Sequence, residues 1–204
     1  MTAVEIEDAV AAIQTGKLAV IPTDTVYGLA CTPYREDAVR ALSELKGRSR
    51  DQPIALVAAS VDLLLDCVPE LRGSAGAIAR ELLPGPYTLV LPNPAKRFTW
   101  LTGARPDTIG VRVPEVVGAA RKLLERVGVA AATSANRHGE PDPRRLADVP
   151  EEILSAVAAA LDGGVLPGTP STVLDLTSAE PRVLREGAVS AAETLARVAA
   201  VLDG

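Results

Sequence analysis

The sequence predicts an α/β protein, because segments with helical apolar spacing alternate with short aliphatic runs. Most of these runs are apolar throughout, which is typical of strands in a sheet that helices cover. The chain has 204 residues and no stretch that resembles an interdomain linker, so we expect one domain over residues 1–204. Aromatic residues make up only 2% of the chain, so the core is expected to be aliphatic.

In the first half of the chain, apolar residues at helical spacing predict a helix over 4–14 that ends at Gly16. The aliphatic run 17–21 predicts a buried strand, which Pro22 ends. A Pro-Gly-Pro break at 84–86 separates the last helix of this half from the strand that follows. The same reasoning predicts helices over 35–46, 61–65 and 74–83 and strands over 54–58 and 87–91.

The second half continues the alternation and closes with a helix over 190–202, which Ser190 is expected to cap, with Glu193 three residues later. Glycine and proline between 163 and 168 predict a long turn. The other predicted strands span 108–113, 129–132, 171–176 and 182–184, and the other predicted helices span 115–127 and 151–161.

The composition disfavours several classes of protein. The net charge of −5 and the few aromatic residues argue against a surface dedicated to nucleic acid. Two cysteines and one histidine provide neither a four-ligand zinc site nor a disulfide framework. The acidic N-terminus is unlike a signal peptide, and no apolar stretch is long enough to span a membrane, so we expect a cytoplasmic protein without a membrane partner.

The common catalytic motifs are absent from the sequence, which has no GxxxxGK[ST], GxGxxG or GxSxG pattern. A thiol nucleophile would require Cys31 or Cys67 beside His138, and the apolar setting of the cysteines makes this pair a weak candidate. Polar stretches that follow predicted strands are better candidates, because open α/β sheets bind their ligands there.

Two such stretches lie in the first half. The hydroxyls of 22–29 could bind a small ligand, or the stretch could be a polar turn in which Asp24 caps backbone groups. Lys46, Arg48 and Arg50 follow a predicted helix. They could clamp a polyphosphate, or they could be there because cations favour the C-terminus of a helix.

Polar residues also follow strands in the second half. Ser134 and Asn136 could cap a following helix, although nearby prolines disfavour a long one. Arg185 follows another strand, where a solvated charge is the ordinary explanation. Thr108 and Arg112 are four residues apart on a predicted strand and therefore share one face. An arginine on so apolar a strand requires an anionic partner, and a bound carboxylate or phosphate would serve.

Seven motifs taken together and in this order resemble the YrdC-like family of threonylcarbamoyl-adenylate synthases. The resemblance covers nearly the whole chain and implies a twisted mixed sheet with flanking helices around a concave cationic cavity. It implies ATP with Mg²⁺, L-threonine and bicarbonate as substrates, and it is to the short form of the family, without the additional C-terminal domain of longer relatives. The motifs are PTDTVYGLA (22–30), KGRSRDQPI (46–54), LLPGPYTLVL (82–91), DTIGVRVP (107–114), TSAN (133–136), STVLD (171–175) and LREGAV (184–189).

The resemblance also implies roles for individual residues. It gives Lys46 and Arg48 the main part in catalysis, and it implies no metal ligand from the protein, because Mg²⁺ would arrive with ATP. The implied ATP contacts are Lys46, Arg48, Arg50, Thr108, Ser134, Asn136, Asp142 and Arg185. The implied contacts to L-threonine are Thr23, Tyr27, Arg112, Ala132 and Ser171.

Two alternatives remain beside the synthase. The resemblance implies that the product passes to a separate complex that makes threonylcarbamoyladenosine next to the tRNA anticodon, and a transient contact with RNA, double-stranded RNA included, fits a cationic cavity. One alternative is therefore a YrdC-like RNA-binding protein without synthase activity, which the acidic composition disfavours. The other is a paralogue that keeps only the fold, which the retained TSAN motif disfavours.

Overall fold

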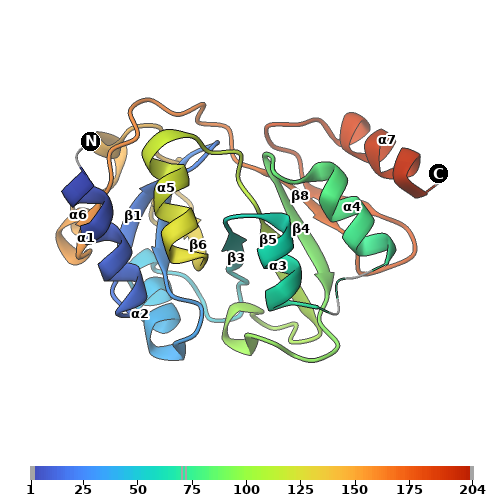
Figure 1. Ribbon diagram of the computed structural model, residues 1–204, viewed down its shortest axis with the longest axis horizontal. Coiled ribbons are helices and arrows are strands. Elements are labelled where there is room, and N and C mark those ends of the chain that lie inside the picture. The colour runs from blue at the N-terminus through green and yellow to red at the C-terminus, as the bar shows by residue number, and fades with distance from the viewer. Residues whose placement is uncertain (1–2, 70, 72, 203–204) are drawn as a thin grey trace.

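The computed structural model of the protein describes residues 3–69, 71 and 73–202. The described residues form a mixed, twisted sheet with helices packed against it (Figure 1). The strands are Ala19–Pro22 (β1), Tyr27–Cys31 (β2), Ala55–Ala58 (β3), Tyr87–Pro92 (β4), Thr108–Arg112 (β5), Val129–Ser134 (β6), Ala159–Ala160 (β7), Thr172–Asp175 (β8) and Arg182–Arg185 (β9). They lie in the order β7-β1-β2-β6-β3-β5-β4-β8-β9.

The helices alternate with these strands, as the sequence predicts. Two short 3-10 helices add to them, Thr99–Leu101 (η1) and Leu146–Asp148 (η2). The α-helices are Ala3–Gln14 (α1), Glu36–Lys46 (α2), Val61–Cys67 (α3), Ser74–Leu82 (α4), Gly118–Val127 (α5), Glu151–Ala156 (α6) and Ala191–Leu202 (α7).

The sheet combines both kinds of strand pairing. β3 is parallel to β5 and β4 is parallel to β8, whereas β6 pairs antiparallel with both β2 and β3. This arrangement confirms the predicted α/β class and the twisted mixed sheet. The Oγ of Ser190 accepts a hydrogen bond from the backbone N–H of Glu193 at 3.2 Å, which confirms the predicted cap of α7.

Two apolar cores lie on opposite faces of the sheet, because successive side chains of a strand point to opposite sides. In β6, Val129 and Ala131 join the larger core with α2, α3, α4 and α7. Their neighbours Ala130 and Ala132 join the smaller core, which α1 and α5 cover. In Figure 1, α1 and α5 lie beside β1 and β6 at one end of the sheet.

The smaller core covers only part of its face. It contains side chains of β1, β2, β3 and β6, but the described members include none from β4, β5 or β8. Val57 of this core is the direct register partner of Arg112, so Arg112 points to the same face. The part of this face formed by β4, β5 and β8 is therefore left without a covering helix, and the cavity described below lies there.

Two elements differ from the prediction. Tyr27–Cys31 is a strand buried along its whole length, whereas the sequence predicts no strand there and allows its first residues either a ligand-binding role or a polar turn. The predicted helix over 151–161 is wrong after Ala156, because the chain turns extended and pairs with β1. There the N–H of Leu161 donates to the carbonyl of Val20 at 2.9 Å. The other predicted elements agree with the structure to within three residues at each end.

Candidate functional site

A cavity of about 420 Å³ opens on the uncovered part of the sheet, and this volume is in the range of small-ligand sites. Thr108, Gly110 and Arg112 of β5 face into it, which confirms the predicted shared face of Thr108 and Arg112. Segments far apart in the sequence therefore meet around one hollow. Of the predicted site residues, the described lining contains Thr23, Arg48, Thr108, Arg112, Ala132, Ser134, Asp142, Ser171 and Arg185.

Arg48 extends from the loop after α2 to the wall of the cavity. Its Nη1 donates to Thr133 Oγ1 at 3.0 Å and its Nη2 donates to the carbonyl oxygen of Pro53 at 2.8 Å. Burial lowers the pKa of Arg48, and the nearby charge of Arg185 lowers it further. Arg48 and Arg185 are therefore two neighbouring positive charges, and no carboxylate is hydrogen-bonded to Arg48 among the described residues. Such an arrangement favours the binding of an anion between the two side chains.

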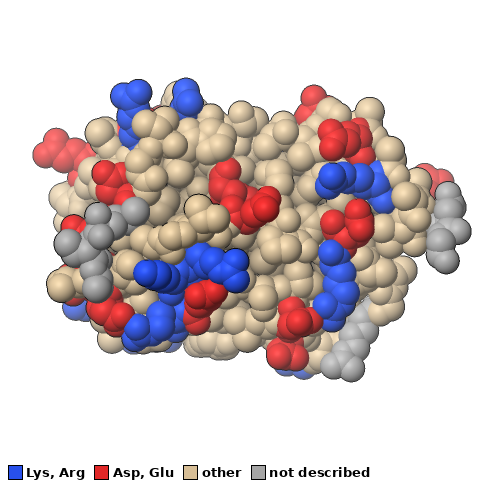
Figure 2. Space-filling model, turned by 45° about the horizontal axis from the view of Figure 1, so that its top comes forward, with Lys and Arg blue, Asp and Glu red and all other residues tan. Residues whose placement is uncertain are grey.

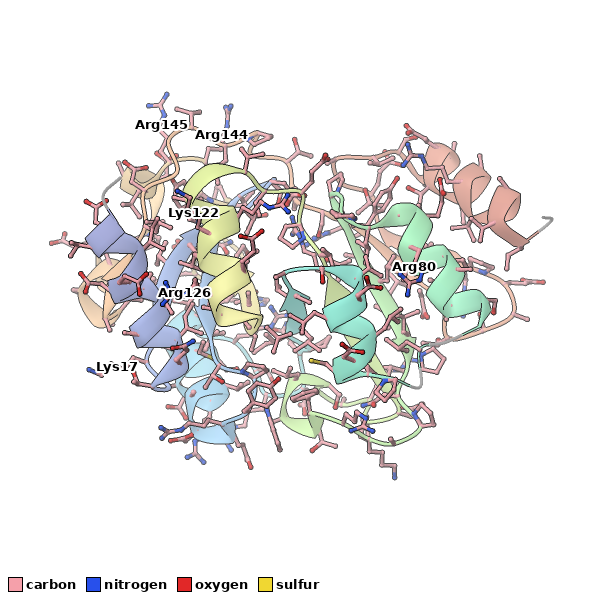
Figure 3. All side chains as sticks on the ribbon, viewed as in Figure 1. Lys17, Arg80, Lys122, Arg126, Arg144 and Arg145 are labelled. Atoms are coloured by element: carbon pink, nitrogen blue, oxygen red, sulfur yellow. The ribbon has the colours of Figure 1, made fainter. Side chains whose placement is uncertain are left out.

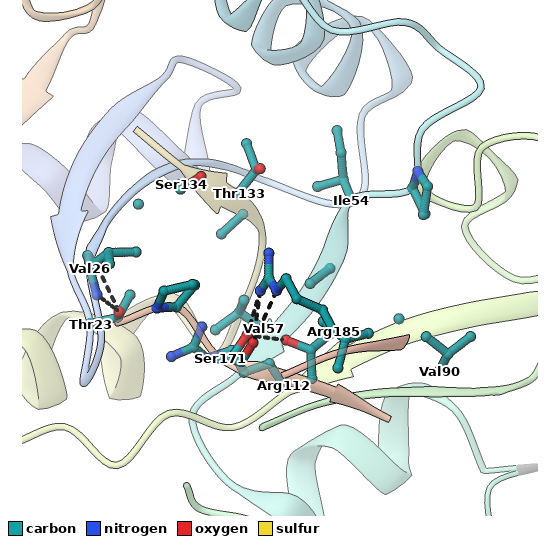
Figure 4. Close-up of a pocket in the computed structure, with 18 of the residues that line it drawn as sticks. Thr23, Val26, Ile54, Val57, Val90, Arg112, Thr133, Ser134, Ser171 and Arg185 are labelled. Atoms are coloured by element: carbon teal, nitrogen blue, oxygen red, sulfur yellow. Dashed lines mark hydrogen bonds between the residues drawn. The ribbon is translucent and has the colours of Figure 1, made fainter. Parts of the chain in front are cut away.

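Arg185, at the end of β9, lines the cavity and is also exposed to solvent. Its Nη2 donates to the carbonyl oxygen of Ser171 at 2.8 Å, and its Nε donates to the same oxygen at 3.2 Å. Ser171 Oγ lies 2.9 Å from Thr88 Oγ1, so β4, β8 and β9 are joined at this wall. Figure 4 shows Arg185, Ser171 and Arg112 side by side. Burial is the main cause that lowers the pKa of Arg185; the charge of Asp142 opposes this shift, and the charge of Arg112 adds to it.

Arg112 differs from these two arginines, because the chain itself supplies its anionic partner. Its Nη2 contacts Asp24 Oδ1 and donates to Thr25 Oγ1 at 2.8 Å. The other oxygen of Asp24 accepts from the N–H of Glu115 at 3.0 Å. The anionic partner that Arg112 requires is therefore Asp24 of the chain itself, for which the sequence suggests only a cap of its own turn.

Thr23 forms the turn in which Asp24 lies. Its Oγ1 accepts hydrogen bonds from the N–H groups of Thr25 and Val26, each at 3.2 Å, and donates to the carbonyl oxygen of Val26 at 2.7 Å (Figure 4). This is the turn chemistry expected of a threonine. The turn also presents the side of Thr23 to the cavity, so the structural and the ligand-binding interpretations of this stretch are compatible.

Lys46 lies behind the cavity wall, 3% exposed, and is not among the described lining residues. Its Nζ donates to the carbonyl oxygens of Ser134 at 2.7 Å and Asn136 at 2.9 Å, and also to both side chains. Burial lowers its pKa to about 8, with the charge of Arg48 as the second cause. Lys46 is also the last residue of α2, so it both ends a helix and holds the turn after β6.

Three other predicted site residues lie outside the described lining. Arg50 is exposed and forms a 3.5 Å ion pair with Glu44. Asn136 is buried with Lys46. Tyr27 is fully buried, and its hydroxyl donates to Asp162 Oδ1 at 2.8 Å. Their predicted contacts to ligands remain predictions, and each would require the side chain to leave the partner that it has here.

Several residues of the cavity wall are not predictable as site residues from the sequence. Thr88 and Arg105 line the cavity, as does Asp51 in the loop that carries Arg48. Arg105 is held only loosely, 3.8 Å from a carboxylate oxygen of Asp175. Thr88 had a detectable signal, because it alternates with core residues on β4. The loop residues had none, since loops show no periodicity.

Surface cations behave differently from the arginines of the cavity. Lys17 and Arg145 point away from the body of the molecule in Figure 3. Arg126 is bound to Glu7 at 2.5 Å, with both side chains about half exposed. Such pairs are screened by water and carry little energy. Among the described residues, Arg48 and Arg185 line the cavity without a carboxylate as hydrogen-bond partner, although Arg48 is half-buried and Arg185 is exposed.

Other kinds of site find no support in the described part of the chain. Burial raises the pKa of the Cys31 thiol to about 12, so it is not a nucleophile. No hydrogen bond joins either cysteine to His138 among the described residues. The described residues also contain no group of three or more His, Cys, Asp and Glu side chains suited to a metal ion. Over the same residues, no helix has the length and apolar character needed to cross a membrane.

The fold and the cavity define an α/β protein with a cavity of small-ligand size on the open face of a mixed sheet. The Sua5_yciO_yrdC family model, described as "Telomere recombination", matches residues 11–187. The chain therefore belongs to the Sua5/YciO/YrdC family, which confirms the resemblance seen in its motifs.

Relatives and solved structures agree with this assignment. The threonylcarbamoyl-AMP synthase of Pyrococcus abyssi is 39% identical over 178 residues, which are 86% of this chain but only 52% of that protein. That of Xanthomonas euvesicatoria is 33% identical over 187 residues, which are 89% of this chain and 97% of that protein. The crystal structure of P. abyssi Sua5 complexed with L-threonine has a TM-score of 0.85 at 37% identity, and the match covers 94% of this chain and 56% of that one.

Proposed function

We propose that this protein is a threonylcarbamoyl-AMP synthase, which makes threonylcarbamoyl-adenylate and pyrophosphate from ATP, bicarbonate and L-threonine. The observation that carries the proposal is the meeting of Arg48, Arg185 and Arg112 in one cavity of about 420 Å³. Within the described residues, Arg48 and Arg185 have only neutral oxygens as hydrogen-bond partners and suit a triphosphate, whereas Arg112 is suited to the carboxylate of an amino acid. The names of the relatives support the same reaction.

The chemistry requires two steps. The amine of threonine attacks the carbon of bicarbonate, and loss of water leaves a carbamate. A carbamate oxygen then attacks the α-phosphorus of ATP, the bond to the β-phosphate oxygen breaks, and pyrophosphate leaves with the electron pair. Phosphoryl-type transfer depends on positioning and on charge neutralisation more than on covalent help from the protein.

The residues of the cavity can supply both the positioning and the charge neutralisation that this reaction requires. Arg48 and Arg185 stabilise the charge on the phosphates, and the hydroxyls of Thr108 and Ser134 add donors along the same wall. Arg112 binds the carboxylate of threonine, with Thr23 and Ser171 nearby. Lys46 holds the Ser134 turn in place, and any direct contact of Lys46 with phosphate remains part of the proposal.

Mg²⁺ is a further part of the proposal. It would neutralise charge on the triphosphate, and it usually binds through one or two carboxylates together with phosphate oxygens. Asp142 provides a carboxylate in the described lining, and Asp51 provides a second. This donor set fits an ion that arrives with ATP better than an ion held by the protein alone.

The destination of the product is also proposed. We expect a separate complex to transfer the threonylcarbamoyl group to tRNA in the cytoplasm, with at most a transient contact between this protein and RNA. On the face shown in Figure 2, acidic and basic side chains are interspersed rather than gathered into one basic field. Such a face disfavours the alternative of a dedicated RNA-binding protein.

A pyrophosphate assay tests the proposal. The purified protein is mixed with ATP, Mg²⁺, bicarbonate and L-threonine, and each component is omitted in turn. We expect pyrophosphate release only when threonine and bicarbonate are both present. Tight binding of RNA without pyrophosphate release would instead favour the RNA-binding alternative.

A further inference from the structure

The contact between Asp24 and Arg112 is the one ion pair of the cavity wall in which both side chains are buried, as far as the chain is described. The side chain of Arg112 is 11% exposed and that of Asp24 is 9% exposed. Asp24 lies in the turn between β1 and β2, whereas Arg112 ends β5. Two strands, β6 and β3, lie between β2 and β5 in the sheet. The turn therefore reaches over them to place a carboxylate on this arginine.

Asp24 contacts Arg112 on the side away from the cavity. It is not among the described residues that line the cavity, and its second oxygen is fixed by the N–H of Glu115 at 3.0 Å. Both hydrogen bonds of the guanidinium, to Asp24 and to Thr25, use Nη2. Nη1 makes no hydrogen bond within the described part of the chain. The pair thus leaves a donor for a ligand while its net charge is zero.

Neither neighbouring arginine has a carboxylate among its described hydrogen-bond partners, and only the charge of Asp142, which raises the pKa of Arg185, partly offsets one of them. The hydrogen-bond partners of Arg48 are a threonine hydroxyl and a backbone carbonyl. Those of Arg185 are the carbonyl and the hydroxyl of Ser171. Arg112 is close enough to Arg185 to lower its pKa. A polyanion in this cavity would therefore be drawn to all three arginines unless one of them were neutralised.

We infer that Asp24 is a specificity-determining residue, which reserves Arg112 for the carboxylate of a zwitterionic amino acid by cancelling its attraction for phosphate. This inference rests on the proposed function, because it assigns the two substrates to two parts of the same cavity. A zwitterionic amino acid has no net charge, so its affinity for the cavity falls little when Asp24 neutralises Arg112. A triphosphate carries several negative charges and is directed to Arg48 and Arg185 instead.

Calorimetric titration with inorganic triphosphate and with L-threonine tests the inference without turnover. Asp24→Asn keeps the size of the side chain and removes its charge. We expect this variant to bind triphosphate about tenfold more tightly or better, because one repulsive charge is lost at short range. We also expect triphosphate to compete with L-threonine in this variant and not in the parent protein. Asp24→Glu retains the charge and should keep the parental affinity for triphosphate.

The matched control is Asp62→Asn, which removes a carboxylate from an exposed ion pair with Arg80. It should leave both affinities unchanged. Unchanged triphosphate affinity in Asp24→Asn would overturn the inference, and so would an equal weakening of both ligands, which would mean that Asp24 only supports the fold.

A second variant keeps the test valid if Asp24→Asn fails to fold. The double variant Asp24→Asn/Arg112→Gln removes the pair without changing its net charge. It should bind triphosphate within about threefold of the parent protein and lose affinity for L-threonine, because phosphate does not use this arginine. A tenfold or larger loss of triphosphate affinity would contradict the inference. The proposed function fails separately, if the parent protein releases no pyrophosphate with threonine and bicarbonate.

Discussion

The Nζ of Lys46 lies 2.7 Å from the carbonyl oxygen of Ser134, so the last residue of α2 holds the end of β6 at the wall of the cavity. The same Nζ reaches the carbonyl oxygen of Asn136 at 2.9 Å. A buried cation with several acceptors is costly to remove, because its partners are left without donors. The positions of Ser134 and Asn136 therefore depend on a residue outside the described lining.

Lys46→Ala should reduce turnover by at least about 100-fold, the loss typical of removing an electrostatic stabiliser. The reason is that Ser134 loses the donor that fixes it beside the phosphates. Steady-state pyrophosphate release measures the effect. Lys122→Ala, on the outer surface of α5, serves as the matched control and should retain full activity. Near-normal turnover of Lys46→Ala would refute the role given to Lys46.

The lowered pKa of Lys46 predicts a pH dependence of stability. Its pKa is about 8 in the folded protein, against 10.5 for an ordinary lysine. Between these values the unfolded chain binds more protons, so the contribution of Lys46 to the free energy of unfolding rises with pH. Urea titrations of the parent protein and of Lys46→Met should diverge over this interval. Parallel curves would show that the pKa of Lys46 is not lowered.

Arg48→Ala should also reduce turnover by about 100-fold, because it removes one of the two cations assigned to the triphosphate. Its KM for ATP should rise more than its KM for L-threonine. Arg80→Ala is the control, since Arg80 is paired with Asp62 on the exposed side of α4. Equal changes in the two KM values would argue that Arg48 does not distinguish the substrates.

The variant Tyr27→Phe tests whether the hydroxyl of Tyr27 stabilises the fold or contacts L-threonine. The single proton of the hydroxyl is shared between Asp162 Oδ1 and the carbonyl oxygen of Gly164, and its oxygen accepts from the N–H of Gly163, each at 2.8 Å. Its loss should lower the free energy of unfolding by about 1–3 kcal/mol, because buried groups lose their partners. The KM for L-threonine should stay within about threefold. A large rise in this KM at unchanged stability would restore the predicted contact between Tyr27 and threonine.

Gly103 joins two loops of the cavity, and its replacement should be disruptive. It has a φ of +61°, and an added Cβ would lie 2.3 Å from the carbonyl oxygen of Asp51. Gly103→Ala should therefore cost several kcal/mol, of the order of the largest single-residue effects. Gly139→Ala is the matched control, because Gly139 has a φ of +87° and open space around its Cα. Thermal unfolding of the two variants should differ clearly, and similar melting temperatures would contradict the packing described.

Most of the fold follows from apolar periodicity, and the exceptions have physical reasons. The run Ala158–Leu161 favours a helix by propensity, but its N–H groups pair with the carbonyls of Leu18 and Val20, so tertiary pairing overrides propensity. Tyr27–Cys31 was missed because Gly28 and the preceding threonines indicate a turn. A Cβ on Gly28 would lie 3.4 Å from the carbonyl of Thr133, so this glycine marks close strand packing.

The candidate site was predictable only in part. The shared face of Thr108 and Arg112 follows from the period of a strand, and so does the need of Arg112 for an anion. The sequence does not indicate that Asp24 is this anion, because the two residues are 88 positions apart. They meet only in the folded sheet, where the turn after β1 reaches across β6 and β3 to β5. The burial of Lys46 behind Ser134 is likewise not predictable from the sequence, because these residues are also far apart in the chain.

The most direct test of the central claim is mass spectrometry of the nucleotide product made with ¹³C-labelled bicarbonate. If triphosphate and amino acid share the cavity as proposed, the product is an adenylate that contains threonine and the labelled carbon. An adenylate of threonine without the label, or ATP left unchanged when both substrates are present, would contradict the account.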